Sequence, residues 1–201
     1  MSGRMGHDEE IDRRLVSRRR RRSRGTAIAP LLDTGWVDLV TISNDAAIGT
    51  LAWTSPENAR TSNDVYTNAL ALSAPITTNY LKGLDLSSGV PAGATILGVQ
   101  IRIERRTSDP GVTDSVVSLV KGGTVQGDNK AAGVDWPIGT SGTGADDAYA
   151  IYGSDSDLWG LTLTAADVNA ADFGLVLSAA IATAFRNALV DNVQMKVFYR
   201  G

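Results

Sequence analysis

Residues that could do chemistry lie mainly in two parts of the sequence, a run of arginines near its start and a group of acids and aromatic residues between 146 and 159. Five consecutive arginines occupy 18–22. Such a run can bind phosphates, with an affinity that falls as salt rises, or make bidentate contacts with carboxylates on an acidic protein surface. It can also be a solvated tail that keeps the chain soluble. Composition alone leaves these three alternatives open.

The residues before the arginine run favour docking onto a protein. Acids between positions 8 and 12 precede the arginines, an order that complements the dipole of a helix over 8–22. Ile11, Leu15 and Val16 would give that helix a narrow apolar stripe, and such a short helix is marginal without a partner surface. We therefore predict a basic N-terminal arm, helical or extended, that anchors the protein to a neighbouring subunit. The predicted anchoring residues are Ile11, Arg13, Arg14, Leu15, Arg18, Arg19, Arg20, Arg21 and Arg22.

The second group combines carboxylates with aromatic rings. Carboxylate oxygens are ligands of hard cations such as Ca²⁺, and acids beside an aromatic platform can bind a carbohydrate. The predicted residues of this glycan or cation loop are Asp146, Asp147, Tyr152, Asp155 and Asp157. The complete Asp-x-Asp-x-Asp-Gly calcium loop is missing, which favours a third interpretation, in which the acids make turns and the rings fill the core. A glycan site would require exposed rings, with Trp136, Tyr149, Tyr152 and Trp159 as the candidates.

Composition excludes several kinds of active site. The chain has no Cys and a single His, His7, so thiol chemistry, disulfides and His-rich metal sites are excluded. It contains neither a Gly-x-Ser-x-Gly elbow nor a phosphate-binding loop. The only glutamates after the arm are Glu57 and Glu104, and Glu104 is predicted on the outer, solvated face of a strand. We expect no enzyme activity, cofactor or metal ion.

Charge is distributed unevenly along the chain. Residues 1–25 hold nine Arg against four acids, a charge of +5, whereas the remaining residues hold ten Lys and Arg against eighteen acids, a charge of −8. A basic arm on an acidic body indicates an interaction tail rather than a uniformly basic nucleic-acid surface. No run of about 18 apolar residues occurs, and the start of the chain lacks the apolar core of a secretory signal, so we expect no membrane association.

The pattern of apolar residues predicts an all-β body. Within 96–106 every second residue from Leu97 to Ile103 is apolar, the period of a strand with one buried face. The expected strands are 35–42, 65–72, 79–86, 96–106, 115–121, 148–153, 158–163, 173–181 and 193–199. One helical turn is expected within 164–172, with Thr164 as its cap and Asp167 three residues later. These elements favour an antiparallel β-sandwich over 31–201, with a jelly roll as the preferred version, preceded by the arm and linker at 1–30.

Most of the chain, from about Trp53 to Tyr199, resembles a β-sandwich module of tailed-bacteriophage structural proteins. The likeness rests on Pro-Ala-Gly-Ala-Thr-Ile at 91–96, Leu-Trp-Gly at 158–160, Phe-Gly at 173–174 and the closing strand after Asp191. It implies a virion component on the particle exterior, attached to capsid or tail and often oligomeric. The basic arm is not part of this pattern, so its tethering role follows from charge alone.

These observations predict a non-enzymatic virion structural protein. Two placements are open, a capsid decoration (cement) protein and a tail-fibre or baseplate appendage. The expected partners are other virion proteins and further copies of the chain, with a trimer as the guessed oligomer. The alternative is a glycan-binding module that recognises a host surface, for which exposed aromatic residues beside acids would be needed.

Overall fold

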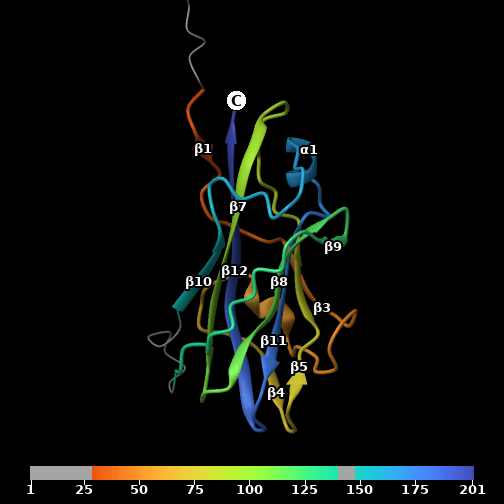
Figure 1. Cartoon of the computed structure of the whole chain (residues 1–201), viewed down its shortest axis with the longest axis vertical. Helices are drawn as coiled ribbons and strands as arrows, with labels where there is room; N and C mark the ends of the chain where they lie inside the picture. Colours follow the sequence, from red (N-terminus) through yellow and green to blue (C-terminus); the bar gives the residue numbers. More distant parts are fainter. Residues whose placement is uncertain (1–28, 140–147) are drawn as a thin grey trace, which may run out of the picture.

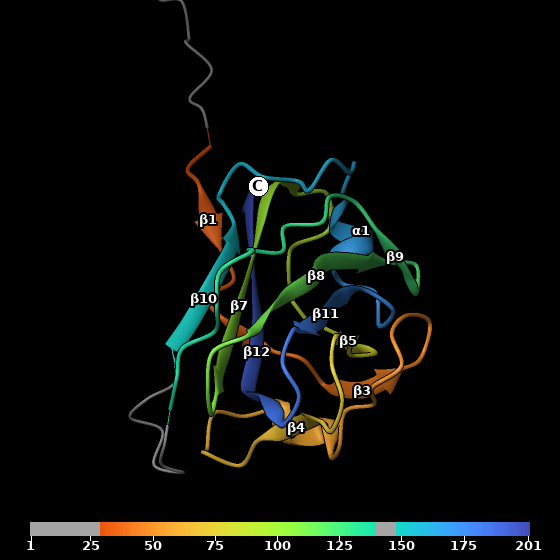
Figure 2. The ribbon, with the colours of Figure 1, turned by 60° about the horizontal axis from the view of Figure 1, so that its bottom comes forward.

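Two antiparallel β-sheets packed face to face form the body of the protein (Figures 1 and 2). The computed structural model describes residues 29–139 and 148–201. Sheet A has six strands: β1 (Leu32–Asp33), β2 (Val37–Asp38), β4 (Thr67–Ala71), β7 (Thr95–Thr107), β10 (Ala148–Gly153) and β12 (Arg186–Arg200). Sheet B has six strands: β3 (Thr41–Asp45), β5 (Ile76–Thr77), β6 (Tyr80–Leu84), β8 (Val112–Lys121), β9 (Thr124–Gln126) and β11 (Gly174–Ile181). The predicted antiparallel β-sandwich is confirmed.

The two long strands of sheet A build half of the core. β7 and β12 pair along most of their length, with Ile103 opposite Val193 and Ile101 opposite Met195. All four side chains are fully buried between the sheets. Because successive side chains of a strand point to opposite faces, the intervening residues of β7 and β12 form the outer face of sheet A.

The central strand of sheet B, β11, is apolar on both faces. Leu175 and Leu177 pack into the main core, whereas Val176 lies in a smaller cluster with Tyr80 and Val120 on the outer face. A strand covered on both faces reads as a continuous apolar run, as the sequence GLVLSAAI does.

Many of the sequence predictions for single elements are confirmed. β10 spans the predicted 148–153, and the short helix α1 (Ala165–Val168) follows Thr164 as expected. The Thr164 side chain accepts a hydrogen bond from the backbone N–H of Asp167 (3.1 Å), and the Asp167 carboxylate accepts one from the backbone N–H of Thr164 (2.8 Å). This reciprocal pair is a complete capping box.

Two of the predicted strands need correction. The expected strand at 35–42 is divided into β2 and β3, because the chain crosses from sheet A to sheet B within it. The segment 158–163 contains no strand: Trp159 and Gly160 have φ angles of 58° and 70°, which turn the backbone sharply. This turn lets the Trp159 indole enter the core and donate a hydrogen bond to the carbonyl of Val99 (2.9 Å).

The strand order is non-sequential in both sheets. Sheet A runs β4–β12–β7–β10 and sheet B runs β6–β11–β8–β9, with β3 beyond β6. From β4 onward the chain changes sheet at every step except β5–β6 and β8–β9. The jelly-roll version of the sandwich stays a prediction.

The described chain begins beside the end of its last strand. Leu32 of β1 pairs with Tyr199 of β12, whereas β4 pairs with the start of β12, where Ala71 lies opposite Arg186. At about 3.3 Å per residue, the length of β12 separates these two ends of the sandwich by roughly 45 Å. Figure 1 shows β1 and the C-terminus at one end and the β4–β5 region at the other.

Candidate functional site

The residues predicted to form a glycan or cation loop have separate roles in the structure. Tyr152 is buried, Asp155 is exposed, and the Asp157 carboxylate lies 2.8 Å from the ammonium of Lys130. Burial raises the pKa of Asp157, but hydrogen bonds from Lys130 and from the backbone N–H of Trp159 outweigh it and hold the pKa below its usual value. Asp146 and Asp147 lie outside the described residues, as do all nine predicted anchoring residues of the arm.

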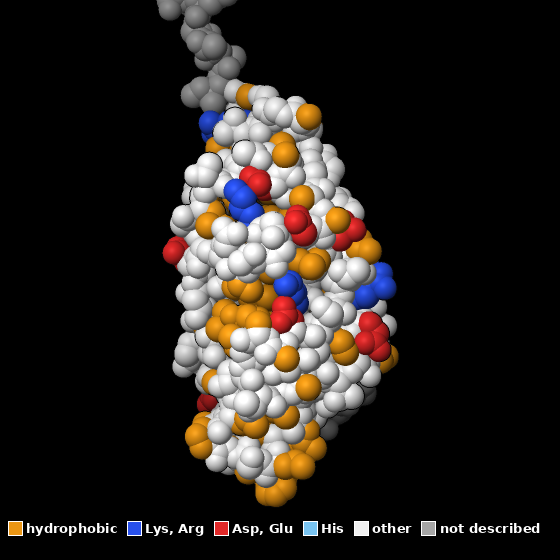
Figure 3. Space-filling view, turned by 90° about the vertical axis from the view of Figure 1, so that its right-hand side faces the viewer, with side chains coloured by type: hydrophobic (Ala, Val, Ile, Leu, Met, Phe, Trp, Pro, Cys, Tyr) orange, Lys and Arg blue, Asp and Glu red, His pale blue; other side chains and the backbone are white. Residues whose placement is uncertain are grey.

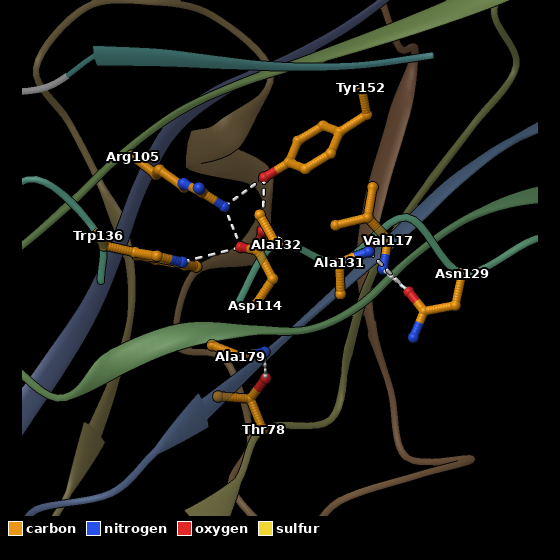
Figure 4. A network of polar contacts seen from close by, with 10 residues as sticks. All are labelled: Thr78, Arg105, Asp114, Val117, Asn129, Ala131, Ala132, Trp136, Tyr152 and Ala179. Atoms are coloured by element: carbon orange, nitrogen blue, oxygen red, sulfur yellow. Dashed lines mark hydrogen bonds and ion pairs between the residues drawn. The ribbon is translucent and has the colours of Figure 1, made fainter. Parts of the chain in front are cut away.

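Two of the aromatic candidates, Tyr152 and Trp136, belong to a buried network of polar contacts (Figure 4). At its centre the Asp114 carboxylate, with no exposed side-chain area, forms an ion pair with Arg105. It accepts further hydrogen bonds from the Tyr152 hydroxyl (2.7 Å), the Trp136 indole (2.9 Å) and the backbone N–H of Ala132 (3.1 Å). The Arg105 guanidinium lies 4.9 Å from the centre of the Trp136 ring and also donates to the Tyr152 hydroxyl.

This network links the two sheets and has the features of a structural element. Arg105 comes from β7 in sheet A and Asp114 from β8 in sheet B. A buried charge is tolerated only when it is paired and hydrogen-bonded, and Asp114 has four donors around it. Burial raises the pKa of Tyr152 well above its ordinary value; nearby Arg105 opposes this shift, and Asp114 adds to it. Tyr152 therefore acts as a neutral donor to Asp114.

Burial also decides what the aromatic candidates can do. Trp136, Tyr152 and Trp159 are 1%, 7% and 0% exposed, so they cannot form a stacking platform for a sugar. Tyr149 is 36% exposed and projects from the outer face of sheet A. The structural interpretation of the three buried rings, as residues that fill the core, agrees with these positions.

The structure offers no arrangement of acids that would hold a metal within the residues it describes. No group of three or more His, Asp or Glu side chains that could bind an ion occurs in 29–139 or 148–201. Glu57 is exposed, and Glu104 is half-buried beside Tyr149 on the outer face of sheet A. In the same ranges, no helix has the length and apolar character needed to cross a membrane.

A row of alternating rings and cations crosses the outer face of sheet A. We name Tyr149, Arg102, Trp36, Lys196 and Phe198 the ring–cation row. The Arg102 guanidinium carbon lies 4.2 Å from the centre of the Tyr149 ring and 4.6 Å from that of Trp36. The Lys196 ammonium lies 4.8 Å from the centre of Trp36 and 5.8 Å from that of Phe198. Each such contact contributes about 0.5–1 kcal/mol at an exposed site.

Strand register brings the members of this row together. Arg102 of β7 lies opposite Gln194 of β12, and Gln194 lies opposite Asp38 of β2. Lys196 is two residues beyond Gln194 and Trp36 two residues before Asp38, and the antiparallel pairing brings both to the same side of the sheet. The row therefore spans β10, β7, β12 and the start of β2.

The Arg102 guanidinium is held on three sides. Its Nε donates to the Gln194 side-chain oxygen (2.5 Å), and the Gln194 amide donates in turn to the Asp38 carboxylate (2.6 Å). The rings of Trp36 and Tyr149 lie against its remaining sides. Among the described residues, none forms a hydrogen bond or an ion pair with the two terminal nitrogens of Arg102. These nitrogens form an oriented fork that matches an anionic group with two oxygens.

The unpaired cations of the body gather on this side of the molecule. Five cations form ion pairs: Lys82, Arg105, Lys121, Lys130 and Arg186. Five others form none with any carboxylate in the described ranges: Arg60, Arg102, Arg106, Lys196 and Arg200. Four of these belong to β7 and β12, and Arg60 pairs through its backbone with Asn192 of β12. An acidic body thus carries a locally basic sheet face.

The opposite side of the molecule is different in character. Figure 3 shows apolar side chains near the middle of that side, next to a contact between opposite charges, and more of them at the lower end. The charged contacts of sheet B include Lys82 with Asp45, at 3.1 Å. Leu72 and Phe185, 68% and 70% exposed, lie in the turns after β4 and before β12. A shallow hollow of about 510 Å³, lined by small and apolar residues of β5, β8 and β11, lies towards the same end.

Comparison with protein-family models, with curated proteins and with solved structures finds no match to this chain. The geometry described above therefore carries the functional argument. It yields one candidate site that the sequence analysis missed, the ring–cation row on sheet A.

Proposed function

We propose that the protein is a non-enzymatic structural component of a virion, a capsid decoration or tail appendage held to neighbouring subunits by its basic N-terminal arm. One observation carries the proposal: the two ends of the sandwich differ. Residues 29–33 join the body beside the end of β12, whereas the exposed Leu72 and Phe185 lie at the start of that strand. A body that the chain enters at one end leaves its far end, roughly 45 Å away, free to project outward, which supports a tethered subunit.

The interior supports this assignment. Two of the charged residues buried in the sandwich, Arg105 and Asp114, bond each other and buried rings, the arrangement of a structural ion pair. The order β4–β12–β7–β10 against β6–β11–β8–β9 also supports the finer proposal of a jelly roll, an architecture common in viral capsid proteins. Oligomer formation belongs to the same proposal and is supported by the resemblance to phage modules, with a trimer as the guessed form.

Deletion of residues 1–25 tests the anchoring proposal. We expect the shortened protein to fold and to stay monodisperse, but to fail to join particles that lack the protein. A second variant replaces Arg18 to Arg22 by Gln, and we expect its association to become weaker and less dependent on salt. A matched control replaces Arg60 and Arg200 of the body by Gln and should join normally. Normal incorporation of the shortened protein would refute the proposal.

Glycan recognition is the second candidate function, and one observation favours it. The loop predicted for that role has buried rings, but the outer face of sheet A presents Tyr149 and Trp36 beside an oriented arginine. Binding of purified protein to immobilised glycans, compared with a Trp36→Ala variant, distinguishes this candidate from a purely structural role.

A further inference from the structure

We propose that the outer face of sheet A binds an acidic polysaccharide and that Arg102 receives a carboxylate of one of its sugar units. The inference rests on glycan recognition, the second candidate function, and is independent of the anchoring proposal. It is carried by the fork of Arg102, whose terminal nitrogens find no partner among the described residues while its other contacts hold it in place.

The fixed position of Arg102 favours binding. An arginine side chain that is free in solution loses rotamer entropy when it is immobilised. Here two rings and the Gln194 oxygen already restrain the guanidinium, and Asp38 restrains Gln194. A carboxylate that meets the fork therefore gains two charge-assisted hydrogen bonds without ordering the side chain.

Charge complementarity identifies the ligand as an anion. Residues 26–201 carry a charge of −8, and a polyanion would be repelled by most of their surface. The cations that lack a carboxylate partner among the described residues gather on or beside sheet A, with Arg102 and Lys196 within the ring–cation row. Asp38 and Glu104 share that face, but Asp38 is bonded to Gln194 and Asn192, and Glu104 lies against Tyr149. Arg102 and Lys196 thus remain available to the ligand, whereas Arg106 is buried and donates to the carbonyl of Gly139.

The shape of the face favours a polysaccharide over an acidic protein. Protein interfaces draw much of their affinity from apolar anchors that fill pockets, and the hollow described above lies among strands of sheet B. The face of sheet A instead offers ring surface in the open, with Tyr149 36% and Ile151 57% exposed around Arg102. A sugar ring presents an apolar face of C–H groups that can stack on such residues while its carboxylate reaches the guanidinium.

The row is also long enough for an extended ligand. From β10 through β7 and β12 to β2 it crosses three inter-strand spacings, about 14 Å in all. Lys196 lies opposite Gln100 of β7, and Gln100 is two residues before Arg102 on that strand. A second anionic group of the same polymer can therefore approach Lys196.

The test measures binding of polygalacturonate to the full-length protein by calorimetry. Every sample carries Gln in place of Arg18 to Arg22, so that the arm contributes little to polyanion binding. The probes are polygalacturonate, its fully methyl-esterified form and poly-glutamate. The variants are Arg102→Gln, Arg102→Lys and, as the matched control, Arg200→Gln, which removes an exposed cation from the same strand face.

We expect polygalacturonate to bind, and esterification to abolish binding. Loss of charge-assisted hydrogen bonds should make Arg102→Gln about 10- to 100-fold weaker. Arg102→Lys should also weaken binding, because an ammonium lacks the planar fork. Arg200→Gln should weaken binding by less than about fivefold, as expected for an exposed charge.

Four results would overturn the inference. Equal losses for Arg102→Gln and Arg200→Gln would mean that only the overall charge matters. Equally tight binding of poly-glutamate would point to an acidic protein partner. Binding of the esterified polymer at full strength would keep glycan recognition but remove the role of the carboxylate. Absence of binding to any glycan would remove the second candidate function as well and leave the anchoring proposal intact.

Discussion

Replacement of Asp114 by Asn tests the structural role of the buried network most directly. The side chain is fully buried and accepts hydrogen bonds from Arg105, Tyr152, Trp136 and the backbone of Ala132. Asn removes the negative charge and leaves the Arg105 guanidinium, whose side chain is 4% exposed, without a counter-ion. Breaking a buried ion pair by removing one partner costs about 3–5 kcal/mol. Because domains are stable by about 5–15 kcal/mol in total, the loss should be a large fraction of the folding free energy.

Urea denaturation followed by tryptophan fluorescence measures this loss, and Trp136 reports from within the network. The matched control is Asp128→Asn, since the Asp128 carboxylate is 61% exposed and lies 3.7 Å from Lys130. An exposed pair of this kind contributes about 0–1 kcal/mol, so the control should unfold close to the wild type.

A double variant separates the ion pair from simple packing. Arg105→Met combined with Asp114→Leu replaces both charges by apolar groups, and we expect it to be more stable than either single variant. A loss of less than about 1 kcal/mol in the free energy of unfolding for Asp114→Asn would refute the reasoning, because a buried charge left without its counter-ion should destabilise the fold by more than that. Additive losses in the double variant would also contradict it, since coupled residues do not behave additively.

Three further predictions follow from the same structure. The pKa of Tyr152 is raised in the folded state, whereas an unfolded tyrosine ionises at a pH of about 10. The free energy of unfolding should therefore fall as the pH rises above that value. Tyr152→Phe should reduce this fall, as measured by alkaline denaturation curves. A hydrogen bond from Lys82 lowers the pKa of Asp45 in the folded state. The contribution of this pair to the free energy of unfolding should be present above pH of about 4 and be lost on acidification. Urea titrations of Lys82→Met should show a weaker acid dependence, and an unchanged profile would contradict the assignment. Gly174→Ala should unfold the protein or lower its melting temperature sharply, because a Cβ there would overlap the backbone oxygen of Gly83, whereas Gly133→Ala, with open space around it, should melt like the wild type.

The alternation of apolar residues was sufficient to predict the sandwich. It identified β7 and β10 closely because each has one buried face, and the capping box at Thr164 located α1. It failed at 158–163, where apolar residues surround a turn. The positive φ of Trp159 depends on the position of its ring against Val99, a contact between segments 60 residues apart that no local pattern contains.

The buried network left a partial signal in the sequence. Arg105 follows Ile101 and Ile103 at the same period of two, so it lies on the buried face of β7 and needs a partner there. The partner, Asp114, belongs to the other sheet, and packing between sheets cannot be read from the pattern of either strand. The ring–cation row was missed for a related reason. The period of two places Arg102 on the outer face of β7, but its neighbours Trp36 and Lys196 depend on the register of β12 with β2 and β7.

The strand β12 has a consequence for the solubility of the protein at high concentration. One of its sides pairs with β7 from Ala188 to Arg200, and the other is covered by three short strands, β1, β2 and β4, that follow one another along its length. Sheet A therefore has no long straight border there at which a strand of another molecule could add by hydrogen bonding. A border divided into pieces of two to five residues resists the template-driven growth of fibres.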